Sequence, residues 1–231
     1  MPVPELSKDE LEAPRTQQQM SAWVTEVLSV FGSTPEGKSA FRLNKSGLVK
    51  QLVEEMLPLN RFAEGFYLGD PDVEFRLVVG NQSYDALVVR GAQTIKYLQI
   101  TQAFDGYQSY LRKLHLDQNK GVVITGPTPT KDKLTGRAAQ GSGFGVDHRE
   151  VLDKTFQDIR SAVQRKSAMR YEFDTALIVN AESFHFLDAS DEEALHAFVR
   201  SKVVPLACNF GGLYVVSDRK GFAYEYSTGA A

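Results

Sequence analysis

Two apolar runs decide the fold of this chain: ALVV at residues 86–89 and YLQI at residues 97–100. Both runs are too continuously apolar for a strand with one face in water, so we expect them at the centre of a sheet covered on both faces. Turn residues at Gly80-Asn81 and at Gly91 separate three strands, which we place at residues 73–79, 83–89 and 94–101. The sequence therefore predicts a three-stranded meander at the heart of the protein.

Helices and further strands are expected on both sides of this meander. Apolar residues spaced three and four apart predict helices over residues 17–31, 45–57, 104–114, 148–171 and 191–203. We expect Pro58 to end the second of these helices and a loop with a helical turn to follow it over residues 60–71. Shorter apolar runs predict strands at residues 121–125, 175–180, 213–216 and 221–226. The predicted fold is α/β (α+β), with one central mixed sheet and helices on both faces.

We predict one main domain, because no change in composition divides the chain in two. Residues 1–40 are assigned to an N-terminal tail and helix, in which residues 1–15 form a loose tail. Residues 41–231 are assigned to a single domain. Glycines and prolines are frequent over residues 126–145, and we interpret that segment as interrupting this domain rather than joining two.

Composition excludes several classes of protein. Of the 231 residues, 42% are apolar and 24% are charged, as in an ordinary globular protein. No apolar run approaches the roughly 20 residues of a membrane-spanning helix, so we expect no membrane partner. We expect no secretory signal, and the one cysteine, Cys208, is interpreted as a small buried residue. A reducing cytoplasm is therefore the expected location.

Charge is distributed unevenly along the chain. Residues 111–170 carry 12 Lys+Arg against 6 Asp+Glu, although the whole chain has a net charge of −3. A basic segment in an acidic protein could face the phosphates of a nucleic acid, through Arg160, Arg165, Lys166 and Arg170. The alternative is the solvated face of a helix together with a polar loop, and the sequence leaves both interpretations open.

The candidate site lies within the meander. Asp85 lies in the middle of an apolar strand, where a carboxylate is costly unless another group pairs with it. Alternation along the next strand places Gln99 and Thr101 on one face, and the hairpin geometry can bring Asp85 beside them. Oxygen-bearing side chains grouped in this way are suitable ligands for Mg²⁺.

This pattern resembles the restriction-endonuclease-like, or PD-(D/E)XK, nuclease fold. The resemblance consists of a helix with glutamates, a hairpin whose second strand carries Asp85, and a third strand that ends in the triplet at residues 99–101. It covers about residues 44–101 and 148–180, and makes residues 102–147 an insertion. The run QITQAFDG at residues 99–106 is also similar to a group of uncharacterised proteins predicted to have this fold.

The resemblance implies a set of site residues. Asp85 matches the metal-binding Asp and Gln99 matches the second ligand, for Mg²⁺ or Mn²⁺. Glu55 is preferred to Glu54 as the acid of the first helix, because it borders the helix's apolar face. Thr101 occupies the catalytic position at which the family has a lysine that stabilises negative charge.

The residue at position 101 leaves the activity open. Threonine carries no charge, which argues against hydrolysis unless a lysine comes from elsewhere. Lys96 points to the opposite face of its strand by alternation, whereas Lys113 and Lys166 lie on helices and could approach the site.

Three functional hypotheses follow. In the first, the protein is a metal-dependent hydrolase that cleaves the phosphodiester bonds of a nucleic acid. In the second, it is a catalytically inactive module that uses the same sheet to bind nucleic acid or protein. In the third, the N-terminal helix, with Trp23, forms a homodimer in a structural or regulatory protein.

Overall fold

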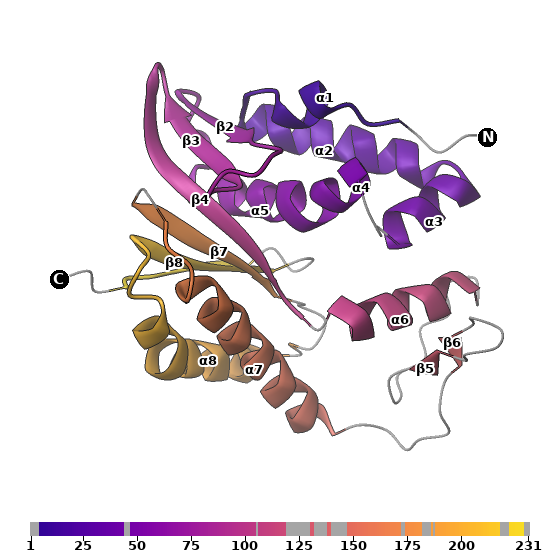
Figure 1. The fold of residues 1–231 in the computed structure, drawn as a ribbon, viewed down its shortest axis with the longest axis vertical. Helices are drawn as coiled ribbons and strands as arrows, with labels where there is room; N and C mark the ends of the chain where they lie inside the picture. The colour runs from indigo at the N-terminus through magenta and orange to yellow at the C-terminus, as the bar shows by residue number, and fades with distance from the viewer. Residues whose placement is uncertain are drawn as a thin grey trace.

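A single seven-stranded mixed sheet organises the computed structural model (Figure 1). The structure describes residues 5–43, 47–104, 106–118, 130–131, 138–139, 147–171, 174–181, 186, 188–217 and 222–228. In spatial order its strands are β1 (Arg15–Thr16), β2 (Val73–Leu77), β3 (Ala86–Arg90), β4 (Gln93–Ala103), β7 (Thr175–Ala181), β8 (Gly212–Ser217) and β9 (Ala223–Tyr226). Pairing is parallel within β4-β7-β8 and antiparallel elsewhere. The prediction of one mixed sheet is confirmed.

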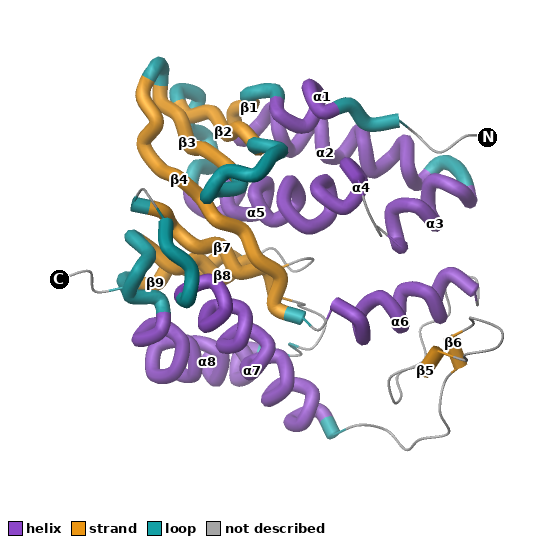
Figure 2. The backbone as a smooth tube through the Cα atoms, in the orientation of Figure 1, coloured by secondary structure: helices purple, strands orange, loops and turns teal. Residues whose placement is uncertain are grey.

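Helices cover both faces of the sheet (Figure 1, Figure 2). The N-terminal layer contains α1 (Lys8–Glu12), α2 (Gln17–Gly32), α3 (Pro35–Leu43), α4 (Gly47–Gln51), the π-helical turn η1 (Leu52–Met56) and α5 (Leu57–Phe66). The opposite layer contains α7 (His148–Ser167), α8 (Ala189–Phe198), the π-helical turn η2 (Val199–Val203) and the 3₁₀ turn η3 (Val204–Leu206). A further helix, α6 (Gly106–Gln118), contacts α3, where Arg42 binds Asp117 at 3.0 Å. The short strands β5 (Thr130–Lys131) and β6 (Ala138–Ala139) pair only with each other.

Two apolar cores lie on the two faces of the sheet. On β4, Leu98 and Ile100 join the core beneath α2 and α5, whereas on β7 the alternating residues Leu177 and Val179 join the core beneath α7. Because both faces are covered, β7 is buried along its whole length. β4 is the fourth of the seven strands, in agreement with the expectation that its apolar run is central.

The N-terminal segment is not a loose tail, and that prediction is wrong. Leu11 on α1 is fully buried, and β1 pairs with β2 to add a strand to the sheet. Met20 and Phe31 of α2 belong to the same core as β4, so residues 5–43 pack into the main domain. The overlooked signal is a capping box in which Ser7 and Glu10 satisfy each other's backbone amides at the start of α1.

Pro58 does not end the second helix, and this prediction is also wrong. The chain continues through the π-helical turn η1 into α5, which ends at Phe66. Proline is tolerated because it lies in the first turn of α5, immediately after the wider π-helical turn. Residues 60–66 are therefore helical rather than loop.

Candidate functional site

Asp85 is held at the point where β3 stops pairing with β4. Its N–H donates to the Leu98 carbonyl (2.8 Å), and its own carbonyl accepts from Val78 (2.9 Å). The register of the two strands ends at the pair Ala86–Leu98, so β3 offers no partner to the Ile100 amide. The Asp85 carboxylate takes that place and accepts the Ile100 N–H at 2.7 Å.

Gln99 lies directly beside this carboxylate. Its Nε2 donates to Asp85 Oδ2, and only 6% of the residue is exposed. The juxtaposition of Asp85 and Gln99 predicted by alternation is therefore present in the structure. Thr101 is half-buried two positions further along β4, opposite Val179 in the register, on the same face of the strand as Gln99.

Glu55 approaches Asp85 from the π-helical turn η1. Burial raises the pKa of Glu55 to about 7, and the negative charges of Asp85 and Glu54 add to this effect, with Lys50 and Lys166 opposing it. The neighbouring Glu54 instead pairs with Lys50 of its own helix at 3.7 Å. Of the two glutamates, Glu55 is thus the one whose carboxylate is coupled to Asp85.

Lys166 brings the positive charge to this group. It is half-buried in the last turn of α7. Burial raises the pKa of Asp85, while the Ile100 N–H and the charge of Lys166 lower it. Because Lys166 also acts on Glu55, its ammonium lies within electrostatic range of both acids.

Tyr171 completes the group just beyond α7. Its ring packs on Phe210 with centroids 4.9 Å apart, and its hydroxyl donates to the Lys166 carbonyl at 3.3 Å. Burial, followed by the negative charge of Asp85, raises the pKa of Tyr171 to about 12. We call Glu55, Asp85, Gln99, Lys166 and Tyr171 the Asp85 site. Four separate segments of the chain contribute to it.

The other candidate lysines lie elsewhere. Lys96 donates to the Tyr214 hydroxyl, and Tyr214 belongs to the core on the N-terminal face, so Lys96 faces away from Gln99 as alternation predicts. The Lys113 ammonium lies 5.6 Å from the centre of the Phe104 ring. Among the four basic residues singled out in the sequence, Arg160, Arg165 and Arg170 are exposed, and Lys166 is the one whose charge acts on Asp85.

The donor set of the Asp85 site consists of oxygens. Two carboxylates and the amide oxygen of Gln99 are hard ligands, which suits Mg²⁺ or Mn²⁺ held by few protein groups and several waters. Within the described residues, no three His, Cys, Asp or Glu side chains gather as a metal-binding group. A cation here would therefore depend on two acids and an amide.

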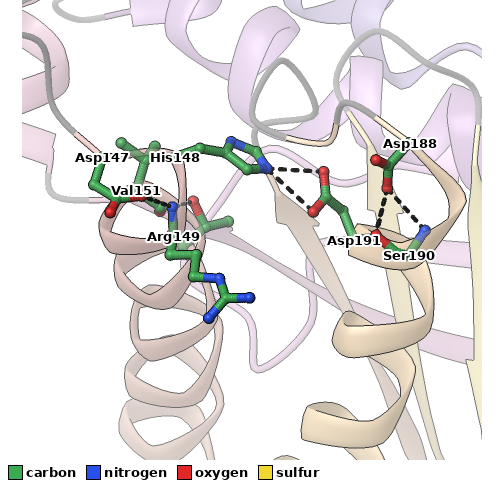
Figure 3. A network of polar contacts seen from close by, with 8 residues as sticks. Asp147, His148, Arg149, Val151, Asp188, Ser190 and Asp191 are labelled. Carbon is green, nitrogen blue, oxygen red and sulfur yellow. Dashed lines mark hydrogen bonds and ion pairs between the residues drawn. The ribbon is translucent and has the colours of Figure 1, made fainter.

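His148 marks a different position on α7 (Figure 3). Its Nε2 lies 3.0 and 3.1 Å from the two carboxylate oxygens of Asp191, so the pair joins the starts of α7 and α8. The N-cap of α7 is Asp147, which accepts from the Arg149 N–H at 2.8 Å. Eighteen residues of helix separate His148 from Lys166, about 27 Å along the axis, so this pair is not part of the Asp85 site.

Two further sequence interpretations change with the structure. Cys208 is exposed rather than buried. Trp23 is half-buried against the N-terminal core with the Arg15 guanidinium 4.1 Å from its ring centre, so much of its apolar surface is already covered. The homodimer through this helix stays a prediction.

Comparison of the chain with protein-family models, with curated proteins and with solved structures found no match. Across the part of the chain that the structure describes, none of the helices has the length and apolar character needed to cross a membrane.

Proposed function

We propose that this protein is a metal-dependent phosphodiesterase of the PD-(D/E)XK nuclease type, in which Lys166 replaces the lysine that the family has at position 101. The observation that carries the proposal is the convergence of Asp85, Gln99 and Glu55 with one lysine from a distant helix. Nucleic acid is the proposed substrate class.

A half-buried pair of acids supports a cation at the Asp85 site. Burial, and after it the charge of Asp85, raises the pKa of Glu55 to about 7, so the two carboxylates repel each other. Folding tolerates such repulsion at a cost that a divalent cation would relieve. Mg²⁺ bound to these acids would polarise a phosphate and lower the pKa of a bound water.

Lys166 supports the phosphodiesterase assignment in particular. The charge of Lys166 lowers the pKa of both acids, so its ammonium would meet a negatively charged oxygen of a substrate bound beside them. A fixed positive charge at this point would stabilise the charge that develops on phosphate during attack by water. The exposed Arg160, Arg165 and Arg170 would contact the backbone further along.

The alternative is an inactive module that binds nucleic acid or protein with the same fold. One observation favours it: Asp85 Oδ2 already accepts from both the Ile100 amide and Gln99, which is sufficient reason to keep the acid for structure alone. Binding to DNA or RNA that weakens steeply with salt, without cleavage, would support this alternative.

The deciding experiment compares the wild type with Asp85→Asn. We expect Mg²⁺ or Mn²⁺ to raise the melting temperature of the wild type, because a ligand at about 100 times its Kd stabilises the native state by about 2.7 kcal/mol. Asp85→Asn should lose this shift and any cleavage of labelled DNA or RNA. Asp153→Asn changes the charge equally at an exposed position on α7 and should retain both. Equal cation shifts in wild type and Asp85→Asn would refute the proposed function.

A further inference from the structure

The π-helical turn that carries Glu55 is anchored from outside its helix. In a regular α-helix, the N–H of residue 58 would donate to the carbonyl of residue 54. Residue 58 is proline and has no N–H, so the Glu54 carbonyl loses that donor. The side chain of Gln102, from the C-terminal end of β4, donates its Nε2 to this same carbonyl.

The side-chain amide of Asn180 fixes which way the side-chain amide of Gln102 is turned. Asn180 is the register neighbour of Gln102 on the parallel strand β7, and its Nδ2 donates to Gln102 Oε1 at 2.7 Å. Because the Glu54 carbonyl can only accept, Gln102 must present its NH₂ there and its oxygen to Asn180. Asn180 is 7% exposed, and its Oδ1 is without a partner among the described residues.

The hydrogen bonds from Asn180 to Gln102 and from Gln102 to the Glu54 carbonyl matter for the Asp85 site because they end beside Glu55. Glu54 precedes Glu55 directly, so fixing the Glu54 carbonyl fixes the peptide from which the Glu55 side chain departs. Within η1 the Leu57 N–H donates to the Leu52 carbonyl, five residues back, and such π-helical turns often re-aim side chains at functional sites. Gln102 and Gln99 lie on the same strand, so β4 sets the position of both Asp85's partner and Glu55.

We propose that Gln102 and Asn180 are positioning residues that hold Glu55 at the Asp85 site, because Gln102 donates to the Glu54 carbonyl in place of the N–H that Pro58 lacks. The inference rests on the proposed function for its role in metal binding, although the anchoring itself is independent of that function. It assigns a role to two side-chain amides, that of the half-buried Gln102 and that of the buried Asn180, which the Asp85 site itself does not use.

The test has two readouts on the full chain: hydrogen exchange of the amides over residues 52–59, and Mn²⁺ affinity by calorimetry. Gln102→Leu keeps the bulk of the side chain and removes the donor, and should speed exchange over residues 52–59 at least tenfold and weaken Mn²⁺ at least tenfold. Asn180→Asp replaces a donor by an acceptor, which reverses the preferred direction of the Gln102 amide, and should change both readouts in the same direction.

Thr155→Val is the matched control. Thr155 is buried and likewise donates from its side chain to a helix carbonyl, that of Val151 at 3.0 Å, but it lies on α7 away from Glu55. We expect this variant to leave exchange over residues 52–59 and Mn²⁺ affinity unchanged.

The outcomes separate the two proposals. Unchanged exchange over residues 52–59 in Gln102→Leu would overturn the anchoring, whatever the metal result. Faster exchange with unchanged Mn²⁺ affinity would overturn the link to Glu55. If the wild type binds no Mn²⁺, the proposed function fails and so does the positioning role for metal, while the exchange data still decide whether the amides hold the turn.

Discussion

β4 carries two partly buried charged clusters, one on each face, and they are built differently. On the N-terminal face, Lys96 donates to the Tyr214 hydroxyl, which in turn donates to Glu225 at 2.7 Å, so the positive and negative charges share one bridging group. Around Asp85 on the opposite face, the carboxylate of Glu55 comes from η1 of the N-terminal layer and repels that of Asp85, and the charge of Lys166 acts on both acids. The first cluster is complete as it stands, whereas the second leaves negative charge in excess, as a site that takes a cation would.

The largest expected effect concerns Lys166. Replacing it by methionine should lower the rate of phosphodiester cleavage about 100-fold, since one fixed charge facing the transition state contributes about 2.7 kcal/mol. Mn²⁺ affinity should not fall, because removal of a like charge cannot weaken cation binding. Lys154→Met, with the same charge change further up α7, should cleave at the wild-type rate. Equal rates for the two variants would show that Lys166 takes no part in the reaction.

The second effect tests the complete cluster. Tyr214→Phe removes the hydroxyl that joins Lys96 to Glu225 and leaves a half-buried ammonium without that partner, which should lower the free energy of unfolding by about 1–3 kcal/mol. Urea unfolding measures the loss. Mn²⁺ affinity should match the wild type, and a large drop in it would mean that the two faces of β4 are coupled rather than independent.

The smallest effect is a pH-dependent gain in stability from Glu55→Gln. The pKa of Glu55 is raised to about 7, so between its ordinary value and pH 7 the unfolded chain ionises this group and the folded chain does not. Stability therefore falls as pH rises through that window, and the penalty is complete above pH 7.

In the variant this penalty is absent. Its free energy of unfolding should equal that of the wild type near pH 4 and exceed it at pH 8, by about 1 kcal/mol once solvent screening at this half-buried position is allowed for. Saturating Mg²⁺ should reduce the difference at pH 8. A difference that does not change with pH would contradict the raised pKa of Glu55.

Local rules explain which parts of the site could be predicted. Asp85 and Gln99 meet because alternation and hairpin pairing fix adjacent strands within a few residues. Lys166 and Tyr171 depend on how α7 packs across the sheet, which spacing along the chain does not specify. Thr101 shows the limit: it stands where the resemblance leads one to expect a lysine, while the positive charge near Asp85 comes from α7.

The same limit explains the error at Pro58. The rule that proline ends a helix assumes that the freed carbonyl must turn to water. Here Gln102, more than forty residues away in the sequence, supplies the donor, so the helix continues to Phe66. The N-terminal error is of another kind, because the capping box at Ser7 and Glu10 was readable from the sequence and only its burial required the fold.

The place of Asp85 at the end of the β3–β4 pairing also bears on self-association. An unpaired strand edge offers its amides to any other extended chain, and proteins commonly guard such edges with charge. By occupying the Ile100 N–H, the Asp85 carboxylate puts a negative group where an incoming strand would have to bind. Neutral substitutions at this residue would thus expose an edge to neighbouring molecules, and their tendency to aggregate should rise with protein concentration.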